Sequence, residues 1–260
     1  MTGRAAIATR ERAYHGLTGL SRDVTVQPHW HGGLSLMDGG VRRAAPNTTV
    51  RILSGPTGSA YGERVTDLPD DGPEAMRAKL ADVSSVIVDY TQGGIYHEAA
   101  YQDAVAAAAK TSGALWIADE VVTGAGRSGR WFAFQGGESR PDMVTMGKAL
   151  AGGGSPIGAV ILSRDMVERL DRAAWQAYST FRGHPVAMAC LRAYLRVLVR
   201  DDILARVDRL GRHFRERLVA IAQKHPAVSR VDGRGFHWTV ELHGPHWRDW
   251  RADTTEAPIA

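Results

Sequence analysis

Cysteine, long apolar stretches and a signal segment are scarce or missing in this sequence of 260 residues. Cys190 is the single cysteine, which excludes a disulfide within the chain and favours a reducing compartment. The run at 104–109 is among the longest apolar stretches, far short of the roughly 20 residues that a membrane-spanning helix needs. Residues 1–16 carry charge but no apolar core of a secretory signal. We therefore expect a soluble, cytoplasmic protein.

Lysine is scarce as well. Only Lys79, Lys110, Lys148 and Lys224 contribute to the 32 basic residues, and the others are arginines. The arginines are interspersed with carboxylates, as in RDWRAD at 248–253, and form no basic tract with interleaved aromatic residues. The net charge of +4 therefore indicates a solvated surface and argues against nucleic-acid binding.

What the sequence does contain is typical of a globular protein. Hydrophobic residues make up 44% and charged residues 23%, so composition gives no case for disorder. The length suffices for one large domain, or for one domain and part of a second.

The middle of the chain alternates strand and helix patterns, which predicts an α/β fold with a largely parallel sheet. Apolar, β-branched runs predict strands, and an alanine-rich segment that ends at Gly113 predicts a helix. The strands are expected at 83–90, 115–122, 142–147 and 157–163, and the helix at 97–113. The first 80 residues favour loops with brief strands, and Pro73 favours a helix start.

The pattern changes after residue 180. Helical spacing of apolar residues covers 184–202 and 203–225, and strand-like alternation returns at 228–242. These changes predict two domains, 1–205 and 206–260.

Lys148 is the first candidate for chemistry. It follows an apolar strand and precedes the glycine-rich loop ALAGGGSP, and active sites of α/β proteins lie at the carboxyl ends of strands. Its apolar neighbours Met146, Ala149 and Leu150 could shield the amine from water and favour its nucleophilic form. A lysine that merely extends into solvent is the alternative.

Asp119 is the second candidate, because it ends the apolar strand LWIAD. A carboxylate there is costly unless a cation or hydrogen-bond donors meet it. A protonated pyridine nitrogen is one such partner. A metal site or a helix N-cap remains an alternative role for Asp119.

Four separate motifs together resemble those of a known enzyme family. They are IADEVVTGAGRSGRWFAFQ at 117–135, PDMVTMGKALAGGGSPIGAVI at 141–161, YSTFRGHPVAMA at 178–189 and VDGRGFHWTVEL at 231–242. In this order and spacing they resemble the class III, omega-type aminotransferases, which depend on pyridoxal 5′-phosphate (PLP) and have PLP fold type I. The resemblance extends from AYHG at 13–16 to about residue 243. It makes 1–205 the PLP-binding large domain and 206–260 part of the C-terminal small domain.

The resemblance also implies roles for individual residues. Lys148 would form the Schiff base with PLP and move a proton on the substrate, and Asp119 would bind the pyridine nitrogen. Val121 and Tyr14 would pack on opposite faces of the ring. Gln92 would lie near the phenolic oxygen.

Thr180 would reach the phosphate of PLP in a neighbouring subunit, which implies a homodimer with shared sites. The family usually has Glu-Pro where this chain has Asp89 and Tyr90. It also has a region before AYHG that cups the phosphate, and a longer C-terminal domain that grips the substrate carboxylate. We therefore expect a homodimer, a complementary aminotransferase-fragment chain, or both.

The resemblance predicts transfer of an amino group between an amine or amino acid and a keto acid or aldehyde. A non-catalytic scaffold, regulatory subunit or degenerate fragment with the same fold is an alternative. An aminomutase, racemase or decarboxylase is another. Metal binding by His29 and His31 lacks a convincing third ligand, and the glycines at 152–154 do not form a dinucleotide-binding motif. Ser128 and Ser155 lack triad partners.

Overall fold

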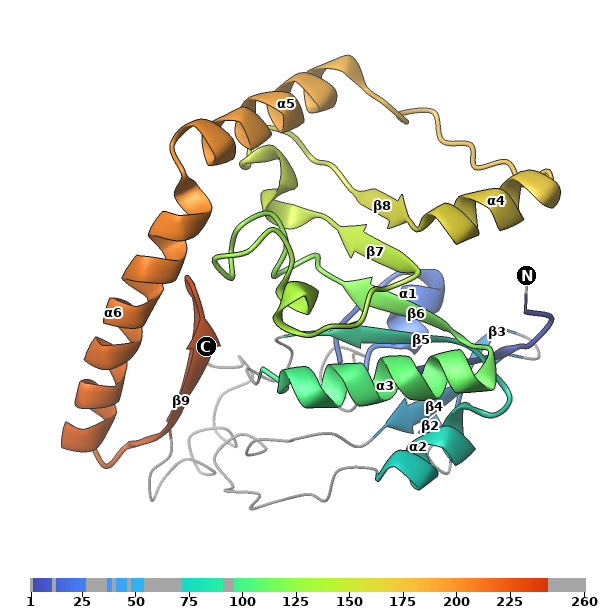
Figure 1. Cartoon of the computed structure of the whole chain (residues 1–260), viewed down its shortest axis with the longest axis horizontal. Coiled ribbons are helices and arrows are strands. Elements are labelled where there is room, and N and C mark those ends of the chain that lie inside the picture. The colour runs from blue at the N-terminus through green and yellow to red at the C-terminus, as the bar shows by residue number, and fades with distance from the viewer. Residues whose placement is uncertain are drawn as a thin grey trace, which may run out of the picture.

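A computed structural model describes most of the chain (Figure 1). The described residues are 2–10, 13–26, 37–38, 41–45, 48–53, 72–90 and 96–242. His29, His31 and Gln92, for which the sequence made predictions, lie outside the described residues.

A sheet in the order β2-β3-β4-β1-β5-β6-β7-β8 forms the centre of the molecule. Neighbouring strands from β4 through β7 run parallel, whereas β2, β3 and β8 join the two edges in antiparallel fashion. The strands are Ala6–Arg10 (β1), Met37–Asp38 (β2), Val41–Ala45 (β3), Thr48–Leu53 (β4), Val83–Asp89 (β5), Leu115–Asp119 (β6), Met143–Met146 (β7) and Ala159–Leu162 (β8). The prediction of an α/β fold with a largely parallel sheet is confirmed.

The strands predicted from apolar runs are all present, although β6 ends at Asp119 rather than at residue 122. For the first 80 residues we expected loops with brief strands, which did not predict the position of β1 inside the sheet. β1 is an inner strand of the sheet, hydrogen-bonded to both β4 and β5. Its sequence AIATR ends in polar residues that pack inside, so its local pattern resembles a loop boundary.

Helices and short 3-10 turns connect the strands. The helices are Gly19–Asp23 (α1), Pro73–Leu80 (α2), Ala99–Ser112 (α3), Arg164–Arg172 (α4), Pro185–Arg200 (α5) and Ile203–Lys224 (α6), and the 3-10 turns are Ala133–Gly136 (η3) and Lys148–Ala151 (η4). The predicted start of α2 at Pro73 is confirmed. Gly113 ends α3 with a φ of 68°, a left-handed conformation that glycine adopts without strain.

The core lies where α2 and α3 cover one face of the sheet (Figure 1). Val83, Val86 and Val88 of β5 are fully buried, and Val105 of α3 packs in the same cluster. Apolar residues fill this strand because an inner parallel strand is covered on both faces.

The C-terminal part of the described chain consists of α5, α6 and the antiparallel hairpin Val228–Arg234 (β9) and His237–Leu242 (β10). α6 contacts the hairpin at Gly211, where a Cβ atom would lie 2.8 Å from Gly235 Cα, so only glycine allows this approach. The predicted helices and strand-like segment are confirmed. The domain boundary near residue 205 falls in the first turns of α6 and stays a prediction.

Within the described part of the chain, no helix combines the length and the apolar character needed to span a membrane.

Candidate active site

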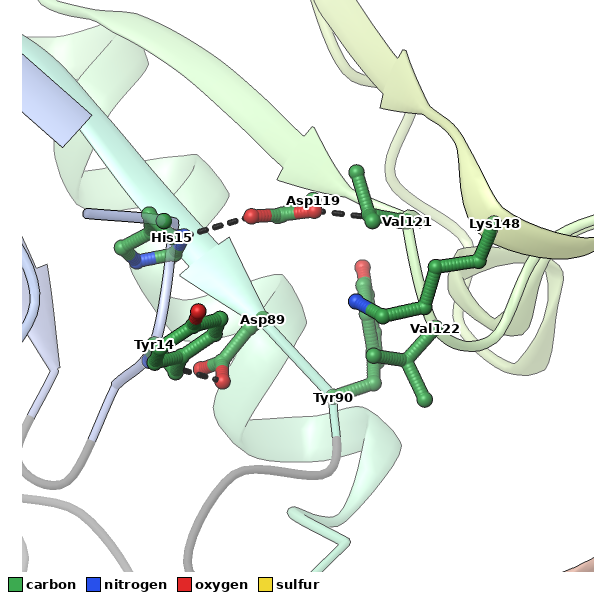
Figure 2. A pocket seen from close by; sticks show the side chains of 9 residues that line it. Tyr14, His15, Asp89, Tyr90, Asp119, Val121, Val122 and Lys148 are labelled. Carbon is green, nitrogen blue, oxygen red and sulfur yellow. Dashed lines mark hydrogen bonds and ion pairs between the residues drawn. The ribbon is translucent and has the colours of Figure 1, made fainter. Parts of the chain in front are cut away.

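The carboxyl ends of β1, β5, β6 and β7 surround a cavity of about 210 Å³ (Figure 2). Such strand ends are the usual place for a site in an open α/β sheet. The lining residues are Tyr14, His15, Gly16, Asp89, Tyr90, Asp119, Val121, Val122 and Lys148. Four of the predicted site residues, Lys148, Asp119, Val121 and Tyr14, therefore share one cavity although they come from three distant parts of the chain.

Asp119 is buried, with a side-chain exposure of 7%, and both of its oxygens accept hydrogen bonds. His15 Nδ1 lies 2.6 Å from Oδ2, and the backbone N–H of Val121 donates to Oδ1 at 3.0 Å. Burial on its own raises the pKa of this carboxyl, but the hydrogen bonds and the His15 charge outweigh burial and lower the pKa. Asp119 is thus held as a carboxylate beside the cavity.

His15 is one of the lining residues to which the sequence interpretation gave no role. Its side chain is 1% exposed, and its Nε2 lies 3.1 Å from Thr9 Oγ1 while Nδ1 meets Asp119. Two partners on opposite sides of the ring fix its orientation. The signal available in the sequence was its place next to Tyr14 in AYHG, but the contact with Asp119 joins residues 104 positions apart.

Glu120 follows Asp119 but takes a different role. It is 1% exposed, and it accepts hydrogen bonds from Thr123 Oγ1 and from the backbone N–H of Phe134 at 2.9 Å. Burial raises the pKa of its carboxyl. Because Glu120 ties the turn after β6 to η3, it fixes the backbone that presents Val121 to the cavity.

Lys148 opens η4, with Gly147 between it and the end of β7, and has a φ of 44°. A residue with a side chain rarely adopts this left-handed conformation, and strain of this kind is found more often at functional sites. The side chain extends toward the cavity from the side opposite Tyr14 (Figure 2). Lys148 is exposed, so the shielding that we expected from its apolar neighbours is not present in the described chain.

Thr180 lies elsewhere. It is exposed in the connection between α4 and α5 and does not line the cavity. Among the described residues no cluster of three metal-ligating side chains occurs, and Asp119 has His15 and Val121 as its partners.

A sequence model of the class-III aminotransferase family matches residues 1–256. The chain therefore belongs to this family, as its motifs predicted.

Individual relatives agree with this assignment. The acetylornithine aminotransferase of Mycobacterium tuberculosis is 31% identical over 261 residues, which cover 99% of this chain and 58% of the relative. The crystal structure of an S-selective transaminase from Arthrobacter sp. superposes with a TM-score of 0.79 at 30% identity, covering 93% of this chain and 54% of that one. The predicted fold type I is thereby confirmed.

A third similar structure contains a cofactor at its active site. It is an ornithine aminotransferase from Toxoplasma gondii with partial occupancy of PLP at its active site, at a TM-score of 0.73 and 25% identity, covering 92% of this chain and 52% of that one. In all three comparisons this chain spans little more than half of the other protein's length.

Proposed function

We propose that this chain is the cofactor-binding part of a PLP-dependent aminotransferase. It would serve to move an amino group between an amine or amino acid and a keto acid or aldehyde. The observation that carries the proposal is the convergence of an amine, a buried carboxylate and an aromatic ring on one cavity. Family membership and the named activities of the relatives support it.

The donor set fits PLP at both ends of its ring. The ionised Asp119 would accept a hydrogen bond from the protonated ring nitrogen, since each carboxylate oxygen has a second lone pair. The Lys148 amine, on the other side of the cavity, would bind the cofactor's aldehyde carbon. PLP, when bound, supplies an electron sink for the substrate's α-carbon.

Tyr14 and Val121 would hold the plane of the ring, one on each face. An aromatic face and a β-branched side chain both exclude water without competing for the ring's polar atoms. His15 would act as a positioning residue for Asp119, because it is fixed on its other side by Thr9. After the cofactor is in place, Lys148 would carry the proton between the substrate's α-carbon and the cofactor.

The proposed function includes a second polypeptide, either another copy of this chain or a complementary fragment. The connection 173–184 supports this part, because its aromatic side chains are exposed: Trp175 56%, Tyr178 90% and Phe181 76%. Contiguous exposed apolar groups are typical of interaction surfaces. Thr180 lies among them and would then reach the phosphate of PLP in the partner.

Borohydride trapping tests the cofactor part of the proposal. The purified chain is incubated with PLP, reduced with borohydride and digested, and mass spectrometry locates the phosphopyridoxyl group. We expect it on Lys148, with Lys79, Lys110 and Lys224 as internal controls, and we expect Lys148→Ala to lose it. Equal labelling of all four lysines would show that no specific site exists.

Transfer itself is tested by adding acetylornithine, the substrate named for one relative, and following the bound cofactor's absorbance. A change that 2-oxoglutarate reverses supports an aminotransferase. A chain that binds PLP at Lys148 but turns over no donor, alone or with a complementary fragment, would instead support the scaffold hypothesis.

A further inference from the structure

A second carboxylate lies in the same cavity. Asp89 ends β5 as Asp119 ends β6, and the two residues are direct partners in the register of these strands. Both line the cavity, and Asp89 is only 4% exposed. Two buried carboxylates so close together would disfavour each other's ionisation unless each has its own positive partner.

Arg10 supplies that partner for Asp89. Its Nε lies 2.9 Å from Asp89 Oδ1, and the two side chains are 4% and 5% exposed. Arg10 ends β1, directly after the buried residues Ala8 and Thr9. A guanidinium in such surroundings is costly unless it forms a close ion pair. The ion pair offsets part of the cost of burying both charges at this end of the sheet.

The other oxygen of Asp89 faces the residue that would cover the ring. The backbone N–H of Tyr14 donates to Asp89 Oδ2 at 3.4 Å (Figure 2). Asp89 thus connects the charge of Arg10 to the backbone of Tyr14.

We propose that Arg10 is a positioning residue of the cavity. It cancels the charge of Asp89, which leaves Asp119 as the carboxylate that acts on a bound ring. It also fixes the carboxylate of Asp89, whose other oxygen receives the N–H of Tyr14. The ion pair between Arg10 and Asp89 is present whatever the chain binds. Its role toward PLP rests on the proposed function. Other ionisable groups near the pair or in the cavity are Tyr14, His15, Tyr90, His97, Asp119, Glu120 and Lys148. The charge of Lys148 also acts on His237, with Arg127 close by, and Asp103 and Arg234 act on Tyr90 and His97.

The proposal predicts effects of opposite sign from the two halves of the pair. Arg10→Met leaves a buried negative charge in the cavity, which favours the protonated form of a nearby amine. Asp89→Asn leaves a positive charge, which disfavours that form. The double variant removes both charges and should behave like the parent protein.

The amine of Lys148 is the reporter. Cofactor-free protein is treated briefly with acetic anhydride across a pH series, and mass spectrometry gives the acetylated fraction of Lys148, with Lys110 as an internal reference. Because Lys148 is exposed, we expect the midpoint to move by only about half a pH unit at low salt, up for Arg10→Met and down for Asp89→Asn. Arg51→Met, which breaks an exposed pair with Asp82, is the matched control and should leave the midpoint unchanged.

Shifts in the same direction for both single variants, or no shift in either, would overturn the proposal. If circular dichroism shows that Arg10→Met does not fold, Asp89→Asn is compared with the double variant instead. The proposal then requires that the pH midpoint of Lys148 acetylation is higher in the double variant. PLP affinity of the same proteins is then measured. Opposite midpoint shifts without PLP binding by the parent chain would sustain the charge pairing and reject the proposed function.

Discussion

The core around the central sheet and the segment from 173 to 200 contain the same kinds of side chain in opposite surroundings. Phe134 of η3 is 8% exposed and packs against Trp116 and Phe132, whereas Phe181 is 76% exposed. His97 is buried near the cavity, and His184, at the start of α5, is exposed. In the first region, other parts of the same chain cover these side chains. The second presents apolar groups to water, as surfaces that associate with another chain do.

The largest expected effect contrasts two phenylalanines. Phe134→Ala should lower the free energy of unfolding by about 3–5 kcal/mol, because it removes a packed ring from the core. Phe181→Ala should change it by less than about 0.5 kcal/mol in the separated chain. Urea titrations of both variants measure this, and similar losses for the two would contradict the contrast.

The next effect concerns association. If the 173–184 connection binds a second copy, removal of the ring of Tyr178 should weaken self-association by about thirtyfold, the effect of an interface residue worth roughly 2 kcal/mol. Sedimentation of the parent and of Tyr178→Ala measures it. Leu20→Ala, at a half-exposed position of α1, serves as control. A parent chain that sediments as a monomer at every concentration would exclude the homodimer.

A smaller effect depends on pH. Burial, with the charge of Arg10, lowers the pKa of His97 to about 3. Between that value and the usual 6.5 the unfolded chain takes up a proton and the folded chain does not, so stability falls as the pH falls. The loss from pH 7 to 5.5 should be about 1 kcal/mol. His97→Phe, which keeps the ring packing against Tyr90 and Tyr101, should remove this part of the loss.

The matched control is exposed His184. His184→Phe is measured alongside, so that the effect of a His-to-Phe change outside the core is subtracted. If His97→Phe and His184→Phe give the same pH dependence as the parent, the contrast between the two regions does not extend to histidine titration.

Local patterns predicted most of the fold but not all of the site. The apolar run of β5 and the alanine-rich α3 with Gly113 are readable because each satisfies its own strand or helix pattern. β1 was not recognised as an inner strand, because the buried Arg10 at its end pairs with Asp89, 79 residues away. The same limit hid the contact of His15 with Asp119. Such pairs are set by strand order, which a single segment does not reveal.

The central claim is that Asp119 and Lys148 bind the same cofactor across one cavity. The most direct test is to measure the affinity for PLP of two aspartate variants. Asp119→Asn should weaken PLP binding by about 10- to 100-fold, because a hydrogen bond to a charged group is worth roughly 1.5–3 kcal/mol. Asp103→Asn, which replaces a carboxylate that caps Glu138 and Ser139 outside the cavity, should leave the affinity unchanged. Equal affinities of Asp119→Asn and the parent protein would contradict the account.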